Sequence, residues 1–369
     1  MRRPARDLHP GAWWLWALGL AAAASATTNP LLLVLLVAVA GFVVALRRSD
    51  QPWSGSFRIY LVIGVAVVLV RVGFRAVLGG ESTGHVLLDL PFVGLPGWAS
   101  GVRLLGPITV DSVLAGLYDG LRLATIVVCV GAANALANPK RLLKSMPPAL
   151  YEVGTAVVVA VSVLPQLSDS LRRVRAARML RGVPGGRVAR LRGVVVPVME
   201  DALERSMALA AGMDARGYGR SGELTGGQRR TTGVLMLAGL CGICVGTYGL
   251  LDGTAPRWLG PPLLAGGVVV ALAGFVSAGR RVQRTRYRPD RWAPAEVLVA
   301  ACGVAVAVGT YAVLGRDYTL VHPGIPGSPE VTVVAVLVLL LGVVPAFVAP
   351  PAPATVPAPA DETPRRVAA

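Results

Sequence analysis

The sequence predicts an all-α, polytopic membrane protein with about eight transmembrane helices and a charged cytoplasmic or interfacial helical platform between spans four and five. Hydrophobic residues make up 54% of its 369 residues and charged residues only 15%, whereas a soluble chain carries about a quarter charged residues. The apolar residues also form long blocks, each about long enough to cross a hydrocarbon core of roughly 30 Å as a helix. Lipid is therefore the main solvent of this chain.

Eight apolar blocks are predicted to span the membrane, and the Arg and Lys residues between them predict their orientation. Basic residues gather in alternate loops and in both tails, whereas the other loops hold only Arg103, Arg257 and Arg316. Because cytoplasmic loops carry the excess of positive charge, we expect a multi-pass protein of the cell (plasma) membrane with both termini cytoplasmic. The predicted spans are residues 12–28, 30–46, 58–79, 108–133, 231–251, 259–279, 296–314 and 331–349.

These spans divide the chain into four parts. Between the fourth and fifth lies the platform, where the apolar run Val153 to Leu164 is short for a span and is expected to dip into the membrane or lie against it. Ala24-Ser25-Ala26 also resembles a signal-peptide cleavage site, but a second apolar run at Leu31 favours an uncleaved first span. The parts are residues 1–137 (spans one to four), 138–230 (platform), 231–348 (spans five to eight) and 349–369 (a disordered tail rich in Pro and Ala).

The formal charge of +16 is explained by the excess of Arg and Lys in cytoplasmic loops and by the attraction of these residues to anionic lipid. No aromatic and basic residues interleave outside the apolar blocks, so no nucleic-acid partner is expected. Cys241 and Cys244 have the spacing of a metal-binding or redox pair, but the sequence has no second such pair and their neighbours are apolar. We therefore expect both cysteines to be small hydrophobic residues buried in the protein. No metal or cofactor is expected on this chain.

The platform contains a short basic turn after Asn138 and two longer helices. The first of these runs from about Tyr151 to Arg181 and is ended by Gly182, and the second runs from Pro197 to Arg216 and is ended by Gly217. Each carries an apolar stripe at helical spacing. The stripes include Leu164, Leu167 and Leu171 on the first helix and Met199, Leu203, Ala210 and Met213 on the second.

Arg181 and Arg216 are thereby placed at the C-terminal tips of two helices, where the helix dipole favours a cation. A single such Arg could merely cap its helix or extend to lipid head groups. The repetition of the arrangement favours a functional role for both.

Leu180-Arg181-Gly182 and Ala215-Arg216-Gly217 resemble the two Ala-Arg-Gly signatures of the transmembrane (T) component of energy-coupling factor transporters, the CbiQ-like family. His9-Pro10 and Asn29-Pro30 also fit the opening of that family. The resemblance covers about residues 8–250. The sequence departs from the family in two ways. Leu180 stands where Ala is usual in the first signature, and three further spans follow the single span that is expected after the second signature.

This resemblance implies an ABC-type importer of vitamins or transition metal ions. Two ABC ATPase subunits would dock at Arg181, Gly182, Ala215, Arg216 and Gly217, and a small substrate-binding membrane subunit would be the third kind of partner. ATP and Mg²⁺ are expected on the partner ATPases and not on this chain. The apolar stripes would then pass the motion of the ATPases to the substrate-binding subunit.

Two other classes of function compete with this hypothesis. An enzyme is disfavoured for two reasons. The glycines at 217, 219 and 222 match the G-x-G-x-x-G pattern of dinucleotide-binding sites, but they follow a helix instead of the strand that such a site requires. No P-loop for binding ATP is present either. A self-contained secondary transporter or channel would place ionisable residues inside its spans. Such residues are few here: Arg71, Arg75, Asp111, Asp119 and Arg122.

Overall fold

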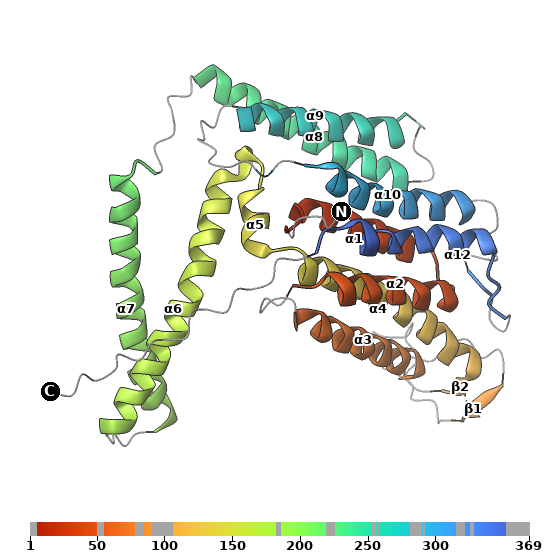
Figure 1. The fold of residues 1–369 in the computed structure, drawn as a ribbon, viewed down its shortest axis with the longest axis horizontal. Helices are drawn as coiled ribbons and strands as arrows, with labels where there is room; N and C mark the ends of the chain where they lie inside the picture. Colours follow the sequence, from red (N-terminus) through yellow and green to blue (C-terminus); the bar gives the residue numbers. More distant parts are fainter. Residues whose placement is uncertain are drawn as a thin grey trace, which may run out of the picture. The chain divides into compact units, whose positions relative to one another are not determined.

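The chain folds into α-helices and one short antiparallel β ribbon in the part that the computed structural model describes (Figure 1). The described residues are 6–49, 55–77, 85–89, 106–181, 186–218, 226–252, 256, 258–280, 290, 292–314, 322–324 and 328–351. They form two compact units. Unit 1 comprises Met1–Leu142 and Asp290–Ala369, and unit 2 comprises Leu143–Pro289.

Unit 1 joins the N-terminal helices to the last helices of the chain. The β ribbon lies between its third and fourth helices, with Val86 opposite Thr109 and Leu88 opposite Ile108. Its elements are α1 (Pro10–Ser25), α2 (Pro30–Arg47), α3 (Phe57–Val77), β1 (Val86–Leu88), β2 (Ile108–Thr109), α4 (Val110–Leu136), α10 (Pro294–Leu314), α12 (Val333–Leu340), the 3₁₀ turn η4 (Leu341–Val343) and α13 (Pro345–Val348).

The first two helices begin in the same way. His9 Nδ1 accepts a hydrogen bond of 3.1 Å from the backbone N–H of Gly11, and Asn29 Oδ1 accepts one of 3.1 Å from that of Leu31. Each cap is followed by Pro, whose fixed φ suits a first helical residue and whose missing N–H would have lacked a helical partner. The two X-Pro pairs noted in the sequence are therefore helix starts.

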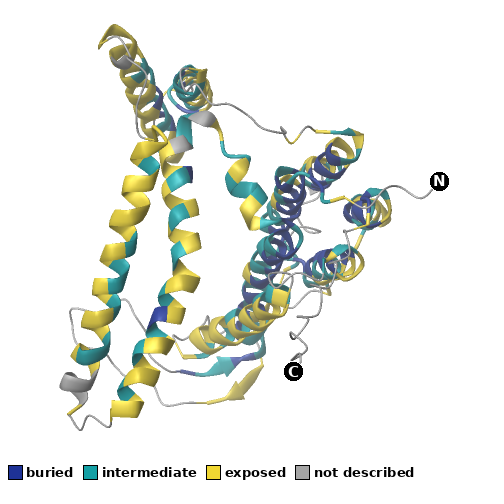
Figure 2. Ribbon diagram, turned by 60° about the vertical axis from the view of Figure 1, so that its left-hand side comes forward, coloured by how far each residue is buried: buried dark blue, intermediate teal, exposed yellow. Residues whose placement is uncertain are grey.

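The core of unit 1 lies around α1, which packs against α10 and α4. Trp16 and Leu20 of α1, Leu33 and Val43 of α2, and Val306 of α10 are completely buried. Figure 2 shows the dark-blue, buried residues concentrated in the helices of unit 1. The indole Nε1 of Trp16 donates to the carbonyl oxygen of Gly342 at 3.1 Å, so its polar atom is satisfied inside the core.

The C-terminal helices complete this core. Asn29 Nδ2 donates to the carbonyl oxygen of Glu330 at 2.8 Å, and Arg47 Nε donates to that of Ala346 at 2.7 Å. The predicted region 231–348 is thus divided between the units: α10, α12 and α13 belong to unit 1, and the two helices before them belong to unit 2. The other domain boundaries stay predictions.

Unit 2 carries the predicted platform from Leu143 onward and one helical hairpin. In the hairpin, a Cβ on Gly242 would lie 2.9 Å from the Cα of Gly267, so small residues allow the two backbones to approach closely. The elements that follow α4 are α5 (Pro139–Lys144), the 3₁₀ turn η3 (Pro148–Leu150), α6 (Tyr151–Arg181), α7 (Arg187–Ala215), α8 (Gly226–Leu251) and α9 (Pro261–Arg280).

The prediction of a polytopic, helical membrane protein is confirmed. Among the described residues, 7 helices are long and apolar enough to cross a membrane. They include α6, whose first half is the run Val153 to Leu164, as part of one continuous helix. The predicted first span corresponds to α1, with 16 residues, and the predicted last span to the shorter apolar stretch Val333–Val348.

Two expectations from the sequence were wrong. The second long platform helix begins at Arg187, ten residues before Pro197, which lies inside α7. A proline inside a helix removes one hydrogen bond without ending the helix, and it was mistaken for a helix start. Cys241 and Cys244 are exposed on α8 and not buried, because the small residues of α8 that face α9 are glycines.

Candidate functional site

The C-terminal end of α6 presents its last side chains to the surroundings. Arg181 is the last residue of this helix and is exposed, and Leu180 before it is 90% exposed. The Leu that departs from the family signature therefore occupies no packed position among the described residues. Gly182, the predicted helix end, lies outside the described residues.

The C-terminal end of α7 is held in a defined geometry. Ala215 is the last helical residue and Arg216 is the C-cap, and Gly217 follows with φ of 75°. The N–H of Gly217 donates to the carbonyl oxygen of Asp214 at 2.9 Å, and that of Tyr218 donates to that of Met213 at 3.0 Å. This is a Schellman motif, and it fixes Arg216 at the helix tip, where its side chain is exposed.

The contact between α6 and α7 is polar. Asp201 Oδ1 lies 3.0 Å from Arg205 Nη2, and Asp201 Oδ2 lies 3.5 Å from Nη2 of Arg173 on α6. A hydrogen bond with Ser170, followed by the charges of Arg205 and Arg173, holds the pKa of Asp201 below its usual value of 3.8. We call Ser170, Arg173, Asp201 and Arg205 the interhelix polar cluster. Sequence analysis missed it, although the spacing of Asp201 and Arg205 is that of a helical ion pair.

Because this polar face of α7 turns toward α6, the predicted apolar stripes remain largely uncovered. Met199 is 54% and Leu203 is 59% exposed on α7, and Leu164 is 62% exposed on α6. Ala210 is exposed as well, whereas Leu167, Leu171 and Met213 are half-buried. Figure 2 shows both long helices mainly in yellow and teal. The stripes offer apolar surface to lipid or to another subunit.

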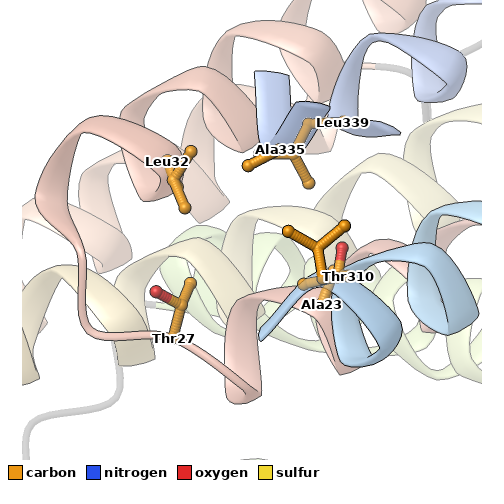
Figure 3. A pocket seen from close by; sticks show the side chains of 7 residues that line it. Ala23, Thr27, Leu32, Thr310, Ala335 and Leu339 are labelled. Carbon is orange, nitrogen blue, oxygen red and sulfur yellow. The ribbon is translucent and has the colours of Figure 1, made fainter. Parts of the chain in front are cut away.

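A small cavity lies inside unit 1, between α1, α2, α10 and α12 (Figure 3). It is lined by apolar side chains and by the threonines Thr27 and Thr310. The hydroxyl of Thr310 is buried and has no hydrogen-bond partner among the described residues. The space suits about one water molecule, so this cavity is too small for a transported solute.

The ionisable residues inside the predicted spans do not form a cluster that could hold a metal ion. No group of three or more His, Cys, Asp or Glu side chains with that geometry occurs in the described part of the chain. Arg122 on α4 donates to the carbonyl oxygen of Ser25, at the end of α1. Arg71 and Arg75 on α3 are exposed.

Comparison with known proteins identifies a family for this chain. Residues 1–225 match the CbiQ family, which is described as cobalt transport protein. The chain is 28% identical over 214 residues to the energy-coupling factor transporter transmembrane protein EcfT of Limosilactobacillus fermentum, covering 53% of this chain and 73% of the relative. It is 29% identical over 217 residues to EcfT of Bacillus selenitireducens, and the match covers 56% of this chain and 74% of the relative.

The apolar helices and the EcfT relatives together indicate a multi-pass membrane subunit of a transporter that contains further subunits. The chain belongs to the CbiQ family. Within that family it is the transmembrane component of an energy-coupling factor transporter. The matched segment ends before α8, so the last helices lie outside it.

Proposed function

We propose that this chain is the coupling subunit of an ABC-type importer in the cell membrane, with both termini in the cytoplasm. Two ABC ATPase subunits dock at the ends of α6 and α7, and a separate small membrane subunit binds a vitamin or a transition metal ion. ATP and Mg²⁺ bind to the ATPases, where hydrolysis occurs, and this chain performs no catalysis. It converts the movement of the ATPases into movement of its own helices.

The observation that carries this proposal is the pair of exposed Arg side chains at helix ends, Arg181 and Arg216. A guanidinium is always charged and offers a planar set of donors that can pair with a carboxylate through two hydrogen bonds. The Schellman motif at Gly217 fixes the backbone of Arg216 at the tip of the helix. Removing one partner of a buried charged pair at an interface typically costs on the order of 2 to 5 kcal/mol.

The polar contact between α6 and α7 supports the transmission of movement. Asp201 joins the two helices through Arg173 and Ser170, so a displacement of one helix end is passed to the other helix. Packed helices tend to shift as units. The exposed stripe that includes Met199 and Leu203 then offers the apolar surface against which the substrate-binding subunit moves.

Affinity purification of the full-length chain from its native membranes tests this function. We expect two ABC ATPase subunits and one small membrane protein in the purified complex. After reconstitution into proteoliposomes, the complex should accumulate its solute only when ATP is present, with ⁵⁷Co²⁺ and labelled vitamins as the probes.

The same purification distinguishes the second candidate, a self-contained secondary transporter or channel. A chain that purifies alone and moves a solute without ATP would support that class and contradict the coupling role. Arg71, Arg75, Asp111, Asp119 and Arg122 would then be the first residues to substitute, because ionisable side chains inside spans mark transport pathways.

A further inference from the structure

Arg141 lies where the chain leaves unit 1, and Asp290 lies where it returns. Unit 2 begins at Leu143 and ends at Pro289, so these two residues flank the whole inserted segment that carries α6 and α7. Their side chains are in contact within unit 1. Arg141 Nε donates to Asp290 Oδ2 at 3.0 Å, and Arg141 Nη2 donates to Asp290 Oδ1 at 2.6 Å.

A second acidic residue holds the same guanidinium. Arg141 Nη1 donates to the backbone carbonyl oxygen of Asp7 at 2.9 Å and lies 3.7 Å from the carboxylate of Asp7. The Arg141 side chain is only 25% exposed. An isolated surface ion pair contributes little, but a two-pronged pair within a network of charges fixes the orientation of the guanidinium.

Asp290 lies four residues before Pro294, the first residue of α10, and the start of α10 is itself firmly held. Glu296 is 1% exposed and accepts a hydrogen bond of 2.9 Å from Arg6 Nη2. The same carboxylate accepts one of 3.1 Å from the backbone N–H of Ala293. The ring of Trp292 lies 5.3 Å from that of His9, measured between ring centroids. Asp290 is therefore attached to a fixed part of unit 1.

Arg141 lies on α5, six residues of helix that lead toward α6. We propose that Asp290 and Asp7 are positioning residues that fix Arg141 and so anchor the base of the coupling helices to the membrane core. The role of these helices in coupling rests on the proposed function. The helices from α10 onward lie outside the matched family segment, and this contact gives them a role, because Asp290 precedes α10 and holds Arg141 on α5.

Charge reversal tests the anchor. Arg141→Asp, Asp290→Arg and the double reversal are made in the full-length chain with its four cysteines replaced. Spin labels are placed at the exposed positions Val34 in unit 1 and Met207 in unit 2, and the distribution of distances between them is measured by pulsed electron paramagnetic resonance in nanodiscs. We expect each single reversal to broaden this distribution at least twofold. The double reversal should restore part of the original width, because the contact with position 290 is re-formed while the reversed side chain at position 141 still faces the carboxylate of Asp7.

A second label pair, Val34 and Val308, lies entirely within unit 1 and reports general loss of structure. Its distribution should stay unchanged in all variants. Single reversals that leave the width for Val34 and Met207 unaltered would overturn the proposal. So would equal broadening of the control pair, or a double reversal that remains as broad as the single ones.

Recovery of ATPase subunits with the unlabelled wild-type chain separates the two hypotheses. If no ATPase is recovered, the proposed function fails, while the distance measurement still decides whether Asp290 anchors Arg141. If ATPases are recovered and the distances do not respond to charge reversal, the anchor fails and the docking role stands.

Discussion

The backbones of Gly19 on α1 and Gly303 on α10 are so close that neither position has room for a Cβ atom: one on Gly19 would meet the Gly303 backbone, and one on Gly303 would meet the backbone of Trp16. The contact joins a helix inside the matched family segment to one outside it. The C-terminal helices are therefore part of the core of unit 1.

Gly19→Ala should destabilise the protein, by about 1 to 3 kcal/mol, because the added methyl group overpacks a closed contact. Gly41→Ala is the matched control, since nothing lies within 4 Å of a Cβ built on this helical glycine. There the alanine should stabilise the helix by roughly 0.5 to 1 kcal/mol. Thermal unfolding of both purified variants checks this, and equal shifts in the same direction would be inconsistent with the close contact.

Asp201→Asn should weaken the interhelix polar cluster at neutral pH and make little difference in acid. The hydrogen bond with Ser170, and then the charges of Arg205 and Arg173, lower the pKa of Asp201 in the folded protein. The ionised carboxylate therefore stabilises the fold above its unfolded pKa, and this stabilisation is lost as the pH falls through the lower folded pKa.

The measurement is the difference in thermal midpoint between wild type and Asp201→Asn from about pH 7 to below about pH 4. The difference should shrink toward the acidic end. Glu200→Gln is the control, because Glu200 is an exposed neighbour on α7 and should behave like wild type throughout. A constant difference over the whole range would show that the charge of Asp201 is not what stabilises the contact.

The long helices could be predicted largely from the sequence, because length, apolar content and helix-ending residues act locally. α6 has the predicted bounds, Tyr151–Arg181, and the left-handed residue after α7 is Gly217, as predicted. The partners of each helix could not be predicted. An apolar block in lipid has no polar face that marks its packing side, so the contact between Gly19 and Gly303 left no pattern in the sequence.

The polar contacts were missed for a related reason. Glu296 and Arg6 are 290 residues apart in the chain, and only the fold brings them together. The orientation of α7 was hidden as well, because an apolar stripe normally predicts the buried side of a helix. In this helix Asp201 faces α6 and the stripe around Met199 remains exposed, which fits a surface that contacts another subunit.

Gly217→Val should lower the amount of ATPase recovered with the chain, whereas Gly217→Asn should preserve it. The φ of Gly217 is 75°, a conformation that Asn tolerates but that costs a branched residue roughly 1 to 2 kcal/mol. We expect about a tenfold loss for Val, which corresponds to about 1.4 kcal/mol. Equal recovery with both variants would mean that the geometry of this helix end does not matter for docking.

The docking of ATPases at Arg181 and Arg216 is tested most directly by charge reversal at both helix tips. Arg181→Glu, Arg216→Glu and the control Arg192→Glu, at another exposed position on α7, are compared by quantifying the ATPase subunits that co-purify from native membranes. Each tip variant should retain at most about a tenth of the ATPase, the double variant none, and the control the wild-type amount. Wild-type recovery of both ATPases with Arg216→Glu, together with full uptake, would contradict the assignment.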